Sequence, residues 1–260
     1  MLKLRVIPVL SFNGFGLVKT KQFINPRMVG NPMQTARVYN SRNVDELVFV
    51  DIFASNQNRK VNLAVVKQVI NECFMPVSIG GGINTISDIN DLLQIGADKV
   101  VIKTCAITNA SFITEAAKVF GAQCIVMSVD IIKTTGGLKI YCPLNNNCID
   151  AIDFIKEAES LGAGELFIND VNNDGMMSGF DKALFKTASE ATNLPVIAAG
   201  GAGTPKDFLP LLLNKNITGL AGASIFHYTQ YTPFDIKYTL NNAGYPVRLF
   251  DDHLKEGVNI

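Results

Sequence analysis

The sequence has few of the residues that mark metalloenzymes, membrane proteins and nucleic-acid-binding proteins. Its 260 residues include no tryptophan and only two histidines, His227 and His253, neither at ligand spacing from a cysteine or a carboxylate. We therefore expect no metal, and we find no motif for an organic cofactor. No run of about 18 uncharged apolar residues is present to cross a membrane. With 23 basic and 23 acidic residues, the formal net charge of +0 does not attract nucleic acid over long range.

The cysteines are odd in number and scattered. There are five, without a Cys-x-x-Cys pair: Cys73, Cys105, Cys124, Cys142 and Cys148. Lys3 and Arg5 flank a short strand-like pattern, and no extended apolar helix follows, so we expect no secretion signal. This cysteine usage is typical of the reducing cytoplasm, where we expect the protein to act.

Two halves of the chain carry the same pattern at a constant offset. Pro76–Gly82 returns at Pro195–Gly201, and Glu46–Ile52 returns at Glu165–Val171, each time 119 positions later. A fixed internal period indicates duplicated architecture. The repeated segments are apolar, strand-like runs that end in Asp or Gly-Gly. Strands of a parallel barrel deliver polar groups and phosphate-binding turns to one rim in this way.

Short β-branched runs alternate with segments of helical period, which is typical of parallel βαβ units. The predicted strands are 4–10, 46–52, 76–80, 98–103, 124–130, 165–170, 195–199 and 218–223. The predicted helices include 31–42, 63–73, 86–95, 111–120, 149–161 and 182–191. We predict an α/β protein, a (β/α)8 TIM barrel built from two duplicated half-barrels. It would form a single domain over residues 1–260, with half-barrels at about 1–120 and 121–249 and a short C-terminal extension at 250–260.

Two connections are longer than usual for this architecture. They are 11–30, after the first strand, and 131–149, after the fifth, and both are rich in Gly, Asn and other polar residues. We expect them to be long loops over the active site. Ser11 and Asp130 occupy equivalent strand ends, 119 positions apart, so we expect them to face each other across the barrel mouth.

Two glycine-rich turns, at 80–82 and 200–203, are candidates for phosphate binding. Each follows a strand and precedes a helix, whose N-terminal amides and dipole attract anions. The strand after each turn ends in residues that can donate to the same anion, so the two halves predict a ligand with a phosphate at each end. The alternative is that the glycines only make tight turns. The candidate ligands are Gly82, Lys103, Thr104, Gly201, Gly203, Ala223 and Ser224.

Carboxylates end several of the predicted strands. Asp130 follows the apolar run 125–129, where a carboxylate at the mouth is hard to explain by packing, so it is our candidate for proton transfer. Asp51 ends the second strand, and Asp174 lies in the loop after the sixth; each could contact a ligand or only cap local structure. Lys19, in the first insertion, could close over a phosphate or remain a solvated surface lysine.

Four charged residues lie near the opposite ends of the strands: Arg5, Glu46, Lys99 and Glu165. They could form a paired ring that seals the bottom of the barrel. Independent rim charges that extend to water are the alternative, and spacing alone favours it.

An ordered series of motifs gives the chain a family resemblance. The series comprises Ile7-Pro8, Lys19, 45–49 with 51–52 and 54–55, 80–83, 96–100, Asp174-Gly175 with Ser178-Gly179, 200–203, and Ala223-Ser224 with Phe226-His227. From Met1 to about Leu249 the chain resembles the cyclase (synthase) subunit family of imidazole glycerol phosphate synthase. The resemblance implies a (β/α)8 barrel that binds a ligand with a phosphate at either end.

The resemblance also implies a partner, a separate glutaminase subunit that forms a heterodimer with the barrel and supplies ammonia from below. In the family the charged ring is the gate to an ammonia passage. This implies a functional role for Arg5, Glu46, Lys99 and Glu165, and Asp98 matches a position that contacts the glutaminase.

The departures from the family lie at the top of the barrel. The family uses two aspartates as acid and base; Asp130 matches one, but Ser11 stands at the other position. Serine cannot replace a carboxylate in proton transfer at neutral pH, a loss of about 10² to 10⁴ in rate. Lys103 replaces an asparagine, and Asp174 is followed by Gly-Met-Met where the family has Gly-Thr-Lys. Val101 alters the serine-like lining of the passage.

These departures leave three functions open. The first is a cyclase-type subunit of the histidine pathway that uses ammonia and a small phosphorylated substrate. The second is a cyclase-impaired paralogue of the surface-polysaccharide type, which passes ammonia to a sugar amidotransferase in lipopolysaccharide or O-antigen synthesis. The third is a sugar-phosphate isomerase of the histidine pathway type, although Ser11 counts equally against that chemistry.

Overall fold

Eight parallel strands close into a barrel, as predicted. In the computed structural model, which describes residues 3–142 and 149–249, β1 pairs in parallel with β4 on one side and β11 on the other, so the sheet has no open edge between them. The extension predicted at 250–260 and Cys148 lie outside the described residues. The barrel strands are β1 (Arg5–Phe12), β4 (Leu47–Asp51), β5 (Val77–Gly80), β6 (Lys99–Ile102), β7 (Ile125–Thr134), β9 (Glu165–Asp170), β10 (Val196–Ala199) and β11 (Ile217–Gly222).

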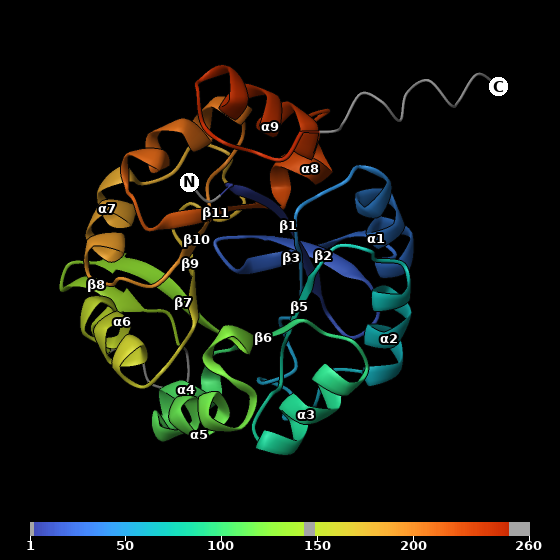
Figure 1. The fold of residues 1–260 in the computed structure, drawn as a ribbon, viewed down its shortest axis with the longest axis vertical. Coiled ribbons are helices and arrows are strands. Elements are labelled where there is room, and N and C mark those ends of the chain that lie inside the picture. Colours follow the sequence, from blue (N-terminus) through green and yellow to red (C-terminus); the bar gives the residue numbers. More distant parts are fainter. Residues whose placement is uncertain (1–2, 143–148, 250–260) are drawn as a thin grey trace.

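Helices surround this barrel on all sides (Figure 1). The six predicted helices are present within two residues of their expected ends: α1 (Pro32–Ser41), α2 (Leu63–Asn71), α3 (Ile86–Gln94), α5 (Ser111–Phe120), α6 (Ala151–Ser160) and α7 (Lys182–Glu190). Local signals define several of these ends. Thr85 and Asp88 form a capping box at the start of α3, in which the side chain of each residue accepts a hydrogen bond from the backbone N–H of the other. Gly96 follows α3 with a φ of 107°, which few other residues adopt readily.

In the parts that the structure describes, the two long insertions form β-ribbons, which corrects the prediction of loops. After β1 the chain forms an antiparallel hairpin of β2 (Leu17–Lys21) and β3 (Ile24–Gly30). After the fifth barrel position, β7 continues to Thr134, four residues past its predicted end, and pairs with β8 (Gly137–Ile140). Their Gly and Asn residues lie partly at turns, so the composition suggested irregular structure although the intervening residues pair as strands.

The structure also contains helices that the sequence pattern did not reveal. They are α4 (Thr104–Thr108), α8 (Ser224–Tyr228), α9 (Pro233–Asn242), and two 3-10 segments, η1 (Ala122–Cys124) and η3 (Pro205–Leu213). Most are only one or two turns long, and η3 contains Pro210, which interrupts a helical pattern. A Thr232–Asp235 capping box begins α9. None of the helices in the described ranges has the length and apolar character needed to cross a membrane.

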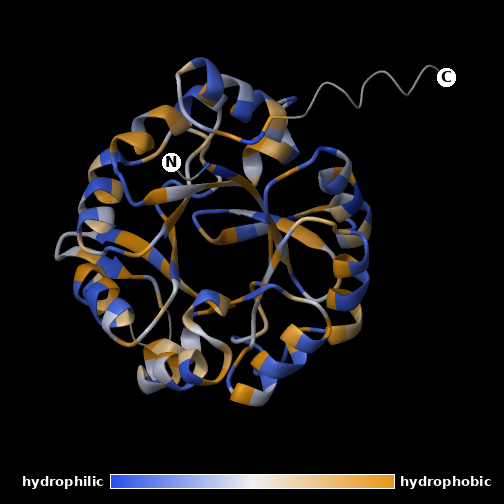
Figure 2. Ribbon diagram, viewed as in Figure 1, coloured by the Kyte–Doolittle hydropathy of each residue, from blue (hydrophilic) through white to orange (hydrophobic). Residues whose placement is uncertain are grey.

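Two apolar layers position the site. The larger lies between the strands and the surrounding helices, and the strands are mostly hydrophobic while each helix alternates in character along its length (Figure 2). The smaller fills the inside of the barrel. Its buried members are Ile7, Val48, Val101, Val126, Phe167, Ile197, Ala199 and Ala221. The packed interior separates the two ends of the barrel, so each end can carry its own polar site.

Candidate functional site

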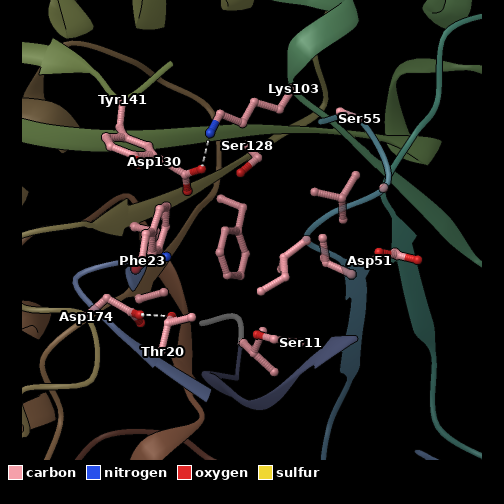
Figure 3. A pocket seen from close by; sticks show the side chains of 18 of the residues that line it. Ser11, Thr20, Phe23, Asp51, Ser55, Lys103, Ser128, Asp130, Tyr141 and Asp174 are labelled. Carbon is pink, nitrogen blue, oxygen red and sulfur yellow. Dashed lines mark hydrogen bonds and ion pairs between the residues drawn. The ribbon is translucent and has the colours of Figure 1, made fainter. Parts of the chain in front are cut away.

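A pocket of about 250 Å³ lies at the carboxyl ends of the barrel strands. Side chains from both halves of the chain line it (Figure 3). Ser11 and Asp130 are both among them, on β1 and β7. These strands are four positions apart in either direction around the barrel. The predicted placement of the two residues across the mouth is therefore confirmed.

Asp130 forms an ion pair with Lys103. The Lys103 Nζ lies 2.5 Å from the Asp130 Oδ2, and the dashed line in Figure 3 joins them. Tyr141, from the segment after β8, covers this pair. Its ring centroid is 5.6 Å from the Lys103 Nζ, and its backbone N–H donates to the Asp130 carbonyl at 2.7 Å. Both charges are thus partly shielded from water, which strengthens the attraction between them.

The β2–β3 hairpin lies over the pocket and carries Lys19 into it. Lys19 is buried, so the alternative of a solvated surface lysine is wrong, and its Nζ lies 3.5 Å from the Asp174 Oδ1. The hydroxyl of Thr20 donates to the other carboxylate oxygen of Asp174 at 3.3 Å. At the tip of the hairpin, the Gln22 N–H donates to the Asp174 carbonyl, and the ring of Phe23 meets the Tyr141 ring edge-on at 5.3 Å. The hairpin is therefore fixed to the loop after β9 and to the β7–β8 ribbon.

Asp51 is held by a residue that the sequence reasoning did not include. Arg59 donates from Nη1 to the Asp51 Oδ2 at 2.5 Å and from Nη2 to the Oδ1 at 2.9 Å. These hydrogen bonds, opposed in part by burial, raise the pKa of Arg59. Arg59 lies in the segment between β4 and α2, and nothing in its sequence context marked it as a partner of Asp51.

The first glycine turn lies at the edge of the pocket beside the end of β6. Gly82 lines the pocket together with Lys103 and Thr104, which starts α4. The turn is also closely packed, because a Cβ on Gly82 would lie 2.2 Å from the Arg59 carbonyl oxygen. Gly82 therefore has a structural reason to be glycine, whatever it binds. Its role and those of its two neighbours toward a phosphate stay predictions.

The second glycine turn lies on the opposite side of the barrel. Ala223 lines the pocket, and the buried hydroxyl of Ser224 has no hydrogen-bond partner among the residues the structure describes. Gly201 and Gly203 lie behind the pocket wall, where Cβ atoms would meet the carbonyls of Gly179 and Met177 at 2.3 Å in each case. The Gly203 N–H donates to Asp207 at 2.9 Å in a helix cap, so it is engaged inside the protein.

Two further titratable groups lie near the pocket. Burial raises the pKa of Asp170, at the end of β9, against the opposing effect of hydrogen bonds from Asn173 and Asn172. On α8, burial and the charge of Lys19 lower the pKa of His227 to about 4, so its imidazole is neutral near pH 7. Within the described ranges, no three or more His, Cys, Asp or Glu residues come together as a metal-binding group.

The four charges at the other end of the barrel form a closed ring. Arg5 pairs with Glu46 at 2.7 Å and with Glu165, and Lys99 pairs with the same two carboxylates at 3.2 Å and 2.8 Å. The Ser78 hydroxyl adds a hydrogen bond to Glu46 at 2.7 Å. Burial alone would lower the pKa of Arg5, but the hydrogen bonds and charges of Glu165 and Glu46 raise it overall. The alternative of independent rim charges is therefore wrong.

Asp98 lies on the same end of the barrel, in the turn between α3 and β6. Its residue is exposed, and its Oδ2 accepts a hydrogen bond from the Val77 N–H at 2.8 Å, at the start of β5. This places Asp98 next to Lys99 of the ring. Its predicted contact with a glutaminase stays a prediction.

Comparison with known proteins identifies the family. A family model described as "Histidine biosynthesis protein" matches residues 5–232. The HisF subunit of imidazole glycerol phosphate synthase from one strain of Dehalococcoides mccartyi is 41% identical over 251 residues, 96% of this chain and 99% of that protein. The chain belongs to the histidine biosynthesis protein family. A HisF subunit from Thermobifida fusca is similar, with 38% identity over 255 residues, 95% of this chain and 99% of that protein. The resemblance stated from the motifs is therefore confirmed.

Several residues at the site were not predicted from the sequence; among them are Phe23 and Tyr141, which line the pocket, and Arg59, which binds Asp51 behind its wall. The two aromatic residues lie in the insertions, whose position over the pocket was expected. An aromatic side chain in a Gly- and Asn-rich connection was the available signal, since such residues need a packing partner. No comparable signal existed for Arg59.

Proposed function

We propose that this chain is an ammonia-using barrel subunit of the imidazole glycerol phosphate synthase type. It would bind a small, doubly phosphorylated ligand in the pocket and receive ammonia from a glutaminase subunit at the other end of the barrel, in a heterodimer. The names of the HisF relatives, which are subunits of that synthase, support this reading.

One arrangement carries the proposal: the closed charged ring and the pocket lie at opposite ends of the same barrel. Between them the interior is apolar, with Val101 and Phe167 in contact with both the interior cluster and the pocket. An apolar interior admits neutral ammonia far more readily than the ammonium ion, because burying an unpaired charge is costly. A polar gate below an apolar interior suits delivery of ammonia to the pocket. Asp98, exposed beside the ring, is available to a protein bound there.

The pocket supports a ligand with two anionic ends. Lys103 and Thr104 lie at one side and Ala223 at the other, in opposite halves of the barrel. Lys19 on the hairpin adds a cation above. Next to Ala223, the buried Ser224 hydroxyl has no hydrogen-bond partner among the described residues and could donate to a ligand oxygen there.

A second candidate is a paralogue with impaired cyclase activity that passes ammonia to a sugar amidotransferase. Ser11 favours it, because the residue facing Asp130 across the mouth cannot act as a general acid or base at neutral pH. In that case the barrel would serve as a conduit, and its own ring-closing chemistry would be slow.

One assay separates the two candidates. The purified chain is given the imidazole glycerol phosphate synthase substrate and a high concentration of ammonium at alkaline pH, with a HisF relative as the positive control. Turnover close to that of the relative would rule out the conduit. Turnover lower by about 10² or more, with the substrate still bound in calorimetry, would favour it. Failure to bind the substrate at all would contradict the first candidate.

A further inference from the structure

Every acidic residue that lines the pocket in the described part of the chain is paired with a cation. Asp51 is bound by Arg59, Asp130 by Lys103 and Asp174 by Lys19. No histidine is among the lining residues that the structure describes. A pocket that carries out proton transfer needs a group able to accept a proton, and here each of these carboxylates has at least one oxygen bound by a cation.

The pair between Lys103 and Asp130 is the most consequential of the three. Asp130 is the carboxylate that faces Ser11 across the mouth. Asp51, by contrast, has both of its carboxylate oxygens bound by Arg59. The Lys103 Nζ and Asp130 Oδ2 are 2.5 Å apart, a charge-assisted hydrogen bond at the short end of the usual range. Lys103 thus occupies one oxygen of Asp130, and a ligand group that contacts the carboxylate does so beside the Lys103 ammonium.

The surroundings of the pair hold it in place. The side chain of Lys103 is 24% exposed and that of Asp130 is 11% exposed, so little water competes for either charge. Tyr141 is tied to Asp130 by the backbone hydrogen bond of 2.7 Å and offers its ring to the Lys103 ammonium. Phe23, at the tip of the β2–β3 hairpin, packs edge-on against Tyr141. The pair is thus covered by Tyr141, which Phe23 from the other insertion supports.

We propose that Lys103 limits proton transfer in this pocket by holding the Oδ2 of Asp130, so that the ion pair, and not the ligand, sets the orientation of the carboxylate. Lys103 is then a positioning residue that acts through Asp130, and proton transfer to or from the ligand is slow while the pair is intact. This inference rests on the proposed function, because it takes the pocket to be the ligand site. It also means that replacing Ser11 by aspartate does not by itself restore a working pair of carboxylates.

The test combines changes at both positions. Turnover of the imidazole glycerol phosphate synthase substrate with ammonium is measured for the full-length wild type, Ser11→Asp, Lys103→Asn, and Ser11→Asp with Lys103→Asn. Asparagine removes the cation and keeps a polar group. We expect less than about tenfold gain from either single change and a gain of about 100-fold or more from the double change, the usual effect of a general acid or base. Ser11→Asp with Lys103→Arg, which keeps the cation, should behave as Ser11→Asp alone.

Two outcomes would overturn the inference. The first is Ser11→Asp alone reaching the rate of the double variant, since Lys103 would then not restrain Asp130. The second is a double variant that binds the substrate in calorimetry but gains no turnover, since Lys103 would then not be what limits the chemistry.

A ligand-free measurement keeps the inference separate from the proposed function. If none of the variants binds the substrate, the proposed function fails, and the pair is then judged by thermal unfolding of Lys103→Asn, Asp130→Asn and the double variant. We expect the shifts in midpoint to be strongly non-additive, because each single change leaves a buried charge without its partner. Additive shifts would show that the two residues do not hold each other, and would overturn the inference.

Discussion

Arg59 binds the carboxylate of Asp51 with both ends of its guanidinium group, at 2.5 Å and 2.9 Å. The Asp51 side chain is fully buried, while that of Arg59 is 30% exposed. The carbonyl of the same Arg59 lies against Gly82, where it leaves no room for a side chain. One residue therefore fixes both the end of β4 and the glycine turn after β5, which together form one wall of the pocket.

Loss of Arg59 should destabilise the protein markedly. Arg59→Met leaves the buried Asp51 carboxylate without a cation, so we expect the free energy of unfolding to fall by about 3 kcal/mol. Arg37→Met is the matched control. Arg37 also binds a carboxylate, Glu72, through two nitrogens, but its side chain is 70% exposed, so we expect little or no loss of stability. Urea unfolding of both variants measures the difference, and equal losses would contradict the structural account.

Gly82 should tolerate alanine poorly because of the neighbouring carbonyl. Gly82→Ala meets both an unfavourable φ of 65° and an oxygen at 2.2 Å. Gly244→Ala is the control, since Gly244 has a φ of 84° and nothing within 4 Å of an added Cβ. We expect the control to cost about 1 kcal/mol of stability, and Gly82→Ala at least about twice as much. Similar unfolding midpoints for the two variants would show that the backbone of the turn shifts at little cost to make room for the Cβ, which would contradict this prediction.

Lys99→Ala should affect the use of glutamine more than the use of free ammonium. The substitution removes a cation shared by Glu46 and Glu165, and the two carboxylates then repel each other, so the ring no longer closes. In the complex with the glutaminase, we expect glutamine-dependent product formation to fall by up to about tenfold, equivalent to about 1.4 kcal/mol of barrier. Ammonium-dependent product formation should stay unchanged.

The exposed Lys118 on α5 provides the control for that experiment. Lys118→Ala also removes one positive charge, but from a residue that makes none of the ion pairs of the ring, and should leave both rates as they are. Equal losses of glutamine- and ammonium-dependent rates in Lys99→Ala would remove the case for a gate.

Stability should depend on pH through His227. Burial and Lys19 lower its pKa from 6.5 to about 4 in the folded state, so between these values the unfolded chain binds more protons. The stabilising effect of neutral His227 is complete above about pH 6.5 and is lost as the pH falls toward about 4. We expect a loss of about 1 to 2 kcal/mol, reduced because the residue is only half-buried. The difference in unfolding free energy between wild type and His227→Gln across this range measures it; a constant difference would contradict the burial effect.

The regular part of the fold could be predicted because its signals are local. The run 165–170 has an apolar centre at 166–168 and ends in polar residues, and β9 has those same bounds. Thr85 and Asp88 are similarly a local signal for the start of α3. The hairpin of β2 and β3 was missed because strand pairing there depends on contacts between its two arms and on the rim below it. The 3-10 segment η3 was missed for a local reason. Its Pro210 is a residue that usually ends a helix, so the sequence pattern did not predict a helical segment there.

The sequence predicted where along the strands the residues of the candidate site lie. It predicted much less well which of their side chains contact one another. Ser11 and Asp130 could be placed across from each other because the internal repeat fixes their strands. The partner of Asp130 could not be predicted, since the sequence marked Lys103 only as a candidate phosphate ligand, and the structure shows that its Nζ lies 2.5 Å from the carboxylate. Long side chains such as lysine reach several ångströms in many directions, so strand position alone does not select their partner.

The sequence by itself determined that this chain forms a doubled barrel with polar residues at both ends of its strands, because apolar periodicity and the repeat are properties of neighbouring residues. Only the tertiary structure decided which charges meet. Lys19 joins Asp174 and Arg5 joins Glu165 across more than half of the chain, and those pairings follow from barrel closure, which brings distant strand ends and the hairpin into contact.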